Sequence, residues 1–185
     1  MKRWTLADGT AVALRDIGPD DAPLVQRFVH GLSDASRRRR FFTAVRQLSD
    51  RQLGRLMRAV RVDDLNIGVI AGDEMVALAQ CLETQPGAAE FGMVVADAWQ
   101  RRGLGARLLS LMCEHARRSG FLTLRADVLA DNWPMLVLAS RLGFQVAEQE
   151  DDDVLEVRLD PSSNRRHFAS PTLHVGDTVV MRSDP

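Results

Sequence analysis

The stretch Gln100-Arg101-Arg102-Gly103-Leu104-Gly105 lies between an apolar run typical of a β-strand, Phe91 to Val95, and a strongly periodic segment. In that segment the apolar residues recur at the spacing of one helical face; they are Leu104, Leu108, Leu111, Met112 and Ala116. Glycines at the turn let the backbone bend tightly and approach a ligand closely. The pattern therefore predicts a strand, a turn and a helix whose unpaired first amides can bind an anion.

Two arginines strengthen this prediction of an anion site. Arg101 and Arg102 carry forked donors that suit the oxygens of a diphosphate. The stretch is not a Walker loop, because Gly-Lys-Ser/Thr is absent, and it lacks the third glycine of a dinucleotide-binding fingerprint. An ordinary turn between strand and helix is the plainer alternative.

A second motif follows downstream, where Asn132-Trp133-Pro134-Met135 precedes Arg141-Leu142-Gly143-Phe144. Together with Gln-x-x-Gly-x-Gly, and in the same order, it resembles motifs A and B of the GNAT superfamily of acetyl-CoA-dependent N-acetyltransferases. The resemblance covers roughly residues 10 to 159. It implies an α/β fold, the GNAT fold, in which a mixed central sheet splays around the cofactor cleft. Within the superfamily the chain looks most like the Pat-like protein lysine acetyltransferases, through Leu32-Ser33, Arg40-Phe41-Phe42 and Leu48-Ser49.

The resemblance also implies roles for individual residues towards acetyl-CoA as co-substrate. The backbone of Val94 and Val95 would bond the pantetheine arm and the acyl carbonyl. The turn would hold the diphosphate through Gln100, Arg101, Arg102, Gly103, Leu104, Gly105 and Ala106. Asn132 would reach the pantetheine and Arg141 the adenosine end. Asn132 could instead be the N-cap of a helix with proline in its first turn.

Acetyl transfer needs a neutral amine, yet an ammonium of pKa about 10.4 is neutral in only roughly one molecule in a thousand near pH 7. A carboxylate beside the acyl group, acting directly or through a water, can take the proton. Glu90 is the candidate base, since it opens the strand that leads to Val95 and matches the base of the Pat-like branch. The alternative is a glutamate on an edge strand that faces water. Glu83 is the second candidate.

The general acid typical of the superfamily is missing. Many members have a tyrosine just after the motif-B leucine, but that position is Ala139 and the chain contains no tyrosine. A thiolate whose thiol has a pKa of about 8.5 is a tolerable leaving group without an acid. Ser140, Cys113 or water could replace the tyrosine. Cys81 and Cys113 fit better as buried core thiols than as nucleophiles.

Length and composition favour one domain, which the resemblance implies is a GNAT domain over residues 1–160, followed by a tail over 161–185 with little periodicity. The 45% hydrophobic content suffices for a sizeable core. With 24 Lys and Arg against 25 Asp and Glu, the net charge of −1 predicts no general attraction to nucleic acid or to a membrane. The N-terminus lacks the apolar core of a signal peptide, which favours the cytoplasm. The four histidines show no metal-site spacing, so no metal is expected.

Local patterns predict the order of elements. Strands are expected at 11–17, 65–71, 75–84, 89–96, 121–128, 144–149 and 154–159, the second to fourth as an antiparallel meander. Helices are expected from Asp20 or Asp21 to His30, from Ser33 to Phe42, over 50–60 behind a capping box of Ser49 and Gln52, and over 133–142, besides the motif-A helix.

Arg37 to Arg40 could form a nucleic-acid patch. Four consecutive helical residues point all round the axis, however, so a solvated helix with Phe41 and Phe42 in the core is the preferred interpretation. The segment 148–153 has five acids in six residues. It is either a soluble turn or an acidic rim that concentrates cationic acceptors.

These features predict an N-acetyltransferase that moves an acetyl group from acetyl-CoA to a primary amine, by resemblance a protein lysine. Two alternatives stay open: an acetyltransferase for a small amine or polyamine, and a catalytically weak module that binds acyl-CoA. The sequence does not fix the oligomeric state.

Overall fold

The computed structural model describes residues 2–43, 46–57, 63–147 and 153–163. Eight strands form one sheet in the order β1-β2-β3-β4-β5-β6-β8-β7. The strands are β1 (Lys2–Thr5), β2 (Ala11–Asp16), β3 (Leu65–Ala71), β4 (Glu74–Gln85), β5 (Ala88–Val95), β6 (Thr123–Leu129), β7 (Gln145–Ala147) and β8 (Val154–Leu159). All neighbours pair antiparallel except β5 and β6, which are parallel. The sheet is thus mixed, as the sequence predicts.

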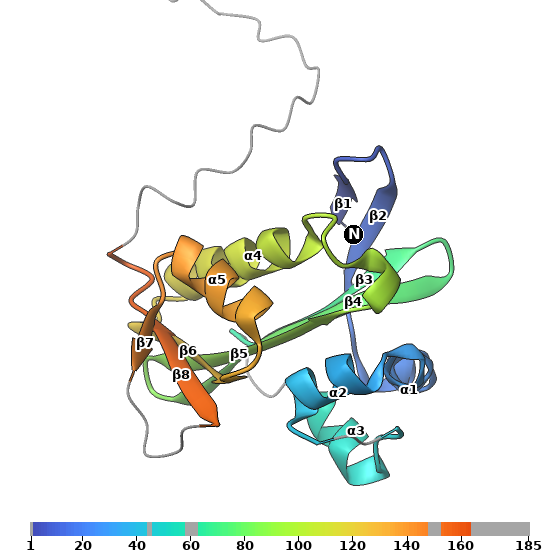
Figure 1. Cartoon of the computed structure of the whole chain (residues 1–185), viewed down its shortest axis with the longest axis horizontal. Helices are drawn as coiled ribbons and strands as arrows, with labels where there is room; N and C mark the ends of the chain where they lie inside the picture. Colours follow the sequence, from blue (N-terminus) through green and yellow to red (C-terminus); the bar gives the residue numbers. More distant parts are fainter. Residues whose placement is uncertain (1, 44–45, 58–62, 148–152, 164–185) are drawn as a thin grey trace, which may run out of the picture.

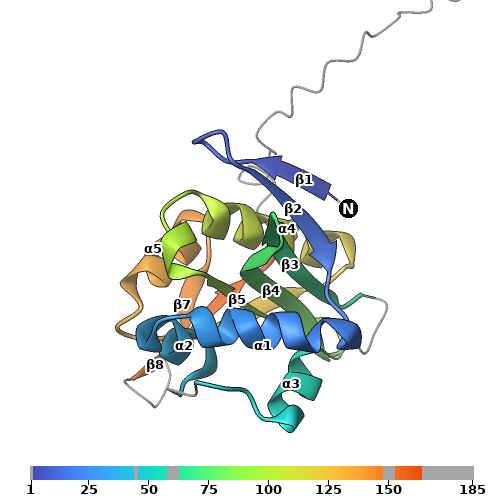
Figure 2. The same ribbon diagram turned by 90° about the vertical axis from the view of Figure 1, so that its right-hand side faces the viewer.

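Helices cover both faces of this sheet (Figure 1). One face carries the motif-A helix and the motif-B helix, α4 (Leu104–Arg118) and α5 (Trp133–Arg141). The other carries α1 (Ala22–Gly31), α2 (Asp34–Phe41) and α3 (Asp50–Leu56), and α1 runs across the strands (Figure 2). Two short 3₁₀ turns, Pro19–Asp21 and Asp97–Trp99, precede α1 and follow β5.

Each face has its own apolar cluster, because side chains of successive strand residues point to opposite faces. Beneath α4 the buried residues include Leu108, Met112 and Phe91. Beneath α1 they include Val25, Leu78 and Val94. The apolar face of α4 is therefore buried, as its periodicity predicts.

The feature that creates the site is the short pairing between β5 and β6. Only Ala88 to Glu90 pairs with Thr123 to Arg125, and beyond this point the two strands separate. Because α4 connects β5 to β6, the helix N-terminus lies at the end of β5 where the gap is open. The predicted splayed sheet is confirmed.

The elements agree with the expected order, with three differences. Strand β1 was not predicted, since four residues offer too little alternation. Helix α3 ends at Leu56, and most of the further turn expected to residue 60 lies outside the described residues. Phe42 was predicted in the core but is 46% exposed, because it takes a left-handed φ of 58° at the end of α2 and turns outward.

The arginines of α2 also differ from a uniformly solvated helix. Arg37 is only 5% exposed, since its guanidinium donates to the carbonyls of Leu32 and His30 at the end of α1 and to Asp34. Phe41 packs against the apolar cluster, as predicted. The run Arg37 to Arg40 therefore points in several directions and makes no single basic stripe.

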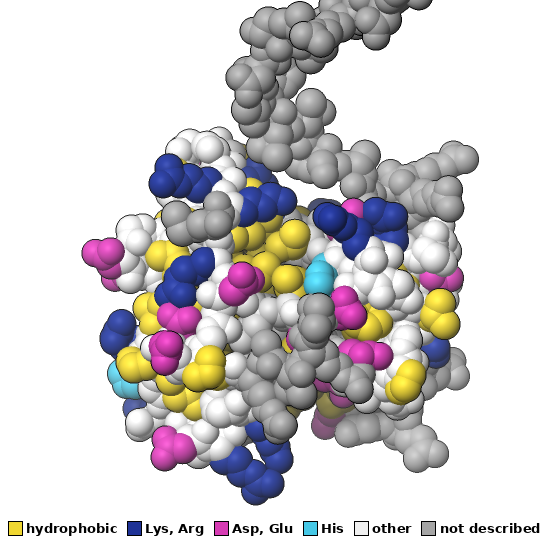
Figure 3. Space-filling view, turned by 180° about the vertical axis from the view of Figure 1, so that it is seen from behind, with side chains coloured by type: hydrophobic (Ala, Val, Ile, Leu, Met, Phe, Trp, Pro, Cys, Tyr) yellow, Lys and Arg dark blue, Asp and Glu magenta, His cyan; other side chains and the backbone are white. Residues whose placement is uncertain are grey.

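Charges of both signs are interspersed on the face drawn in Figure 3. Within the described parts of the chain, no helix has the length and apolar character needed to cross a bilayer. The same residues include no cluster of three or more His, Cys, Asp or Glu that could hold a metal. The acidic segment lies outside the described residues except for Asp153, and so does the tail beyond 163.

Candidate active site in the gap between β5 and β6

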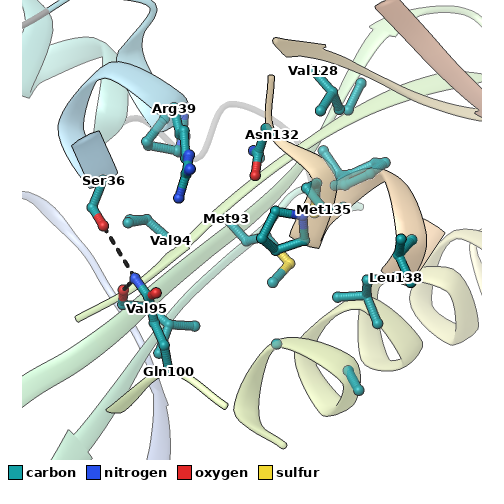
Figure 4. A pocket seen from close by; sticks show the side chains of 18 of the residues that line it. Ser36, Arg39, Met93, Val94, Val95, Gln100, Val128, Asn132, Met135 and Leu138 are labelled. Atoms are coloured by element: carbon teal, nitrogen blue, oxygen red, sulfur yellow. Dashed lines mark hydrogen bonds between the residues drawn. The ribbon is translucent and has the colours of Figure 1, made fainter. Parts of the chain in front are cut away.

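A cavity of about 540 Å³ occupies the gap between β5 and β6. It is bordered by α2, α5 and the motif-A turn (Figure 4). Ten of the twelve residues predicted for the site line it: Glu90, Val94, Val95, Gln100, Arg101, Gly103, Gly105, Ala106, Asn132 and Arg141. The remaining two, Arg102 and Leu104, do not.

The motif-A turn has the backbone shape of an anion site. Arg101 and Gly103 both take positive φ angles, 58° and 86°. The first helical hydrogen bond runs from Arg107 N to Gly103 O, which leaves the preceding amides of the turn for a ligand. Left-handed residues in such a turn direct successive amides into one concavity, where an anion is favoured.

The turn is fixed to the end of β5 and to α2 through one amide side chain. Gln100 donates from Nε2 to the Val95 carbonyl and to Ser36 Oγ, both at 3.1 Å (Figure 4). Asp97 completes the connection, because its carboxylate accepts from the backbone and hydroxyl of Ser33 and from Ser36 Oγ. The side chain of Gln100 therefore positions the turn.

Asp97→Ala is expected to lower the free energy of unfolding by about 1 kcal/mol or less, because the carboxylate is exposed. Burial acts to raise the pKa of Asp97, but the bonds from Ser33 and Ser36 outweigh it and the pKa is lowered. A lowered folded-state pKa gives stability that is present above the unfolded value, near 3.9, and lost as the pH falls through the folded value. Urea titrations at pH 7 and at acid pH check this, and a difference from wild type that persists at the lowest pH would contradict it.

Arg102 and Leu104 have other roles. The Arg102 guanidinium donates to Asp8 and Thr10 in the β1–β2 hairpin and lies 4.4 Å from the centre of the Trp99 ring. Leu104 is only 1% exposed within the core beneath α4. We therefore leave both side chains out of the cofactor site.

The β4–β5 register decides which backbone groups face the gap. Ala96 N donates to Val76 O, and the same alternation along the strands assigns the Val94 amide and carbonyl to Leu78 on β4. Met93 and Val95, on either side of Val94, direct their backbone amides and carbonyls to the opposite side, towards the gap between β5 and β6. The backbone of Met93, and not that of Val94, is therefore the one placed to bond a pantetheine arm in the gap. The Val94 side chain still lines the cavity.

Asn132 directs its side chain towards the cavity (Figure 4). It occupies the N-cap position of α5, but its side chain makes no cap hydrogen bond, and only its carbonyl accepts from Met135 and Leu136. The cap interpretation thus applies to the backbone, and the amide side chain is available to a ligand. Arg141, in the last turn of α5, reaches the same cavity.

Glu90 lies at the opposite end, where β5 and β6 begin to separate. Its side chain is 48% exposed and its carboxylate lies 3.6 Å from Arg125, which also bonds Glu156 at 3.0 Å. Glu90 also interacts with a buried cation, Arg40: burial lowers the pKa of the Arg40 guanidinium to about 10, while the charge of Glu90 opposes the shift. Glu90 is therefore a hydrated carboxylate beside two guanidinium groups.

The other titratable candidates lie elsewhere. Glu83 is not among the cavity residues, and its carboxylate accepts from Gly87 N in the β4–β5 turn. Cys113 and Cys81 are fully buried, and burial raises the pKa of each thiol to about 12. Ala139 is buried, and Ser140 does not line the cavity. Of the proposed substitutes for the missing tyrosine, water alone is left.

Several lining residues were not predicted. Val128 lies in β6, whereas Met135 and Leu138 lie on the inner face of α5, where helical spacing could have suggested them. Others come from α2, namely Ser36, Arg39, Arg40 and Phe42. No local signal in the sequence brings α2 to this cavity, because the contact joins segments about sixty residues apart.

The family model described as Acetyltransferase (GNAT) family matches residues 32–144, which span α2, the sheet from β3 to β6, both motifs and the cavity. The chain belongs to this family. Acetyl-CoA is accordingly its co-substrate, and the protein is an acetyltransferase.

Individual proteins similar to this chain are also acetyltransferases or share the GNAT fold. The chain is 28% identical over 160 residues to acetyltransferase PA5475 of Pseudomonas aeruginosa, covering 83% of this chain and 84% of that protein. The GNAT domain of S. lividans PAT has a TM-score of 0.79 at 27% identity, over 86% of this chain and 96% of that one. Spermidine N-acetyltransferase from Vibrio cholerae, solved with CoA and spermine, shares the fold with a TM-score of 0.67 at 16% identity, over 82% and 96%.

Proposed function

We propose that this GNAT acetyltransferase moves the acetyl group of acetyl-CoA to a primary amine, with the thioester lying between β5 and β6 and Glu90 as the base. The observation that carries the proposal is the cavity, because it joins an anion-binding turn at one end to a carboxylate at the other. Such a cavity suits a long substrate with phosphates at one end and a reactive thioester at the other.

At the phosphate end, the amides of the motif-A turn would bind the diphosphate, assisted by Arg101 and Arg141. Neither guanidinium has an ion pair within the described residues, so both charges are available to phosphate. The pantetheine would extend along β5, bonded by the backbone groups of Met93 and the amide of Val95, whose carbonyl already accepts from Gln100, and by Asn132. This arrangement resembles the addition of one more strand to an open sheet edge.

At the other end, Glu90 would take a proton from the ammonium, directly or through water, and the neutral amine would attack the thioester carbon. A C–N bond forms and the C–S bond breaks; the attacking nitrogen gives up its second proton to water, and CoA leaves as a thiolate that takes a proton from water. Because Glu90 is half-exposed, solvent can carry the proton away. Mass spectrometry of an amine incubated with acetyl-CoA and enzyme tests this, and an unmodified amine would contradict it.

Asn132→Ala is expected to weaken acetyl-CoA binding by about 2- to 12-fold, the usual value of one neutral hydrogen bond. The melting temperature should hardly change, because the side chain makes no cap bond. Calorimetric titration with acetyl-CoA and a thermal scan measure the two effects. A large decrease in melting temperature with unchanged affinity for acetyl-CoA would show instead that Asn132 acts as a helix cap.

The finer assignment of the acceptor is also a proposal. Resemblance to the Pat-like branch favours a protein lysine, and we propose the cytoplasm as the compartment. The relative of similar fold that is named a spermidine acetyltransferase supports a polyamine as the alternative. The absence of any tyrosine supports a second candidate function, a weakly active module that binds acyl-CoA.

A further inference from the structure

Helix α2 places two consecutive arginines, Arg39 and Arg40, on the cavity wall beside β5. Arg39 points into the cavity from above Val94, facing Asn132 across it (Figure 4). Within the part of the chain that the structure describes, Arg39 has no hydrogen bond or ion pair. Its neighbour Arg38 points elsewhere and pairs with Asp131 at 2.7 Å. The charge of Arg39 is therefore left for something that enters the cavity.

Arg40 lies deeper and is also incompletely satisfied. Its guanidinium rests on the backbone of Gly92, so closely that a Cβ added there would lie 2.8 Å from Cζ. One nitrogen donates to Gln80 Oε1 at 2.8 Å, but Nε is buried and has no partner among the residues that the structure describes. A buried cation without a directly bonded carboxylate is costly, so it favours binding an anion.

The proposed cofactor does not supply this anion. Its phosphates belong at the motif-A turn, at the other end of β5 from Glu90, while the pantetheine arm and the acetyl group carry no charge. Glu90 is already engaged with Arg125 at 3.6 Å. An anion beside Arg39 and Arg40 must therefore come from the acceptor.

We infer that the acceptor is a primary amine with a carboxylate close to it, the amine facing Glu90 and the carboxylate bound by Arg39 and Arg40. The inference rests on the proposed function and refines it. Guanidinium groups match carboxylates through paired, charge-assisted hydrogen bonds. The same chemistry is offered by a free amino acid and by a lysine beside an acidic residue in a protein. A polyamine, which is cationic throughout, would be repelled.

The test compares matched acceptors with the wild-type enzyme and saturating acetyl-CoA. One pair is a lysine peptide with aspartate beside the lysine and the same peptide with asparagine there; the other is an amino acid and its carboxamide. The carboxylate member of at least one pair is expected to have a kcat/KM about 10- to 100-fold higher, mainly through KM. Which pair shows the preference identifies the source of the carboxylate, and spermidine should be the poorest acceptor.

Substitutions in α2 test whether Arg39 causes the preference for an acceptor with a carboxylate. Arg39→Gln, an exposed substitution that should fold, is expected to reduce the ratio of the two kcat/KM values towards one. Arg38→Gln, the matched control on the adjacent residue, should keep the ratio. Acetyl transfer without preference for the carboxylate, or a preference that survives Arg39→Gln, would overturn the inference and leave the proposed function standing. Binding of acetyl-CoA without transfer to any of these amines or to spermidine would overturn both.

Discussion

Replacing Glu90 with glutamine is expected to slow acetyl transfer at neutral pH by about 10²- to 10⁴-fold and to leave the affinity for acetyl-CoA nearly unchanged. Glutamine keeps the size of the side chain but cannot accept the proton. The rate of the variant should recover partly as the pH rises towards the pKa of the amine, about 10.4, because the fraction of neutral amine grows without a base.

Steady-state kinetics from neutral to alkaline pH, with calorimetry for acetyl-CoA, measure these effects. Glu83→Gln is the matched control, because Glu83 lies on the neighbouring strand outside the cavity. Equal turnover of Glu90→Gln and wild type would exclude Glu90 as the base and leave proton removal to solvent.

The second large effect is expected from Gly105→Val, which should abolish measurable binding of acetyl-CoA in a protein that still folds. Gly105 lines the cavity in the first turn of α4, where a side chain would intrude on the proposed diphosphate site. A Cβ at this position would lie 3.3 Å from the flexible end of Met93 and 3.6 Å from Leu138. The fold can accommodate those contacts by small shifts. Gly103→Val is a less informative variant, because the φ of 86° would strain any branched residue.

Calorimetric titration and circular dichroism on the same sample separate loss of binding from loss of folding. Gly18→Val is a suitable control, since Gly18 has extended backbone angles and open space around its Cβ position. Retained affinity in folded Gly105→Val would exclude the motif-A turn as the diphosphate site.

The sequence predicts the parts of the site that depend on local structure. The strand, the glycine turn and α4 follow from periodicity and from glycine chemistry, and each lies where it was expected. The capping box of Ser49 and Gln52 forms as predicted. Motif B likewise places Asn132 and Arg141 on the cavity. Short-range physics is sufficient for such features.

Features that depend on distant pairings could not be predicted. The backbone groups of Met93, rather than those of Val94, face the gap, because the β4–β5 register directs the Val94 groups to Leu78. The Arg102 side chain does not line the cavity, because its guanidinium binds Asp8 in the hairpin about ninety residues earlier in the chain. The approach of α2 to β5, which brings Arg39 into the cavity, is equally non-local.

The central expectation is that an amine reacts with acetyl-CoA in the gap between β5 and β6. Release of free CoA thiol, followed with and without amine acceptors in wild type and Glu90→Gln, tests it most directly. We expect release from wild type to depend on the acceptor and to fall steeply in the variant. Tight binding of acetyl-CoA with no acceptor-dependent release would contradict the claim and would make the protein a binding module.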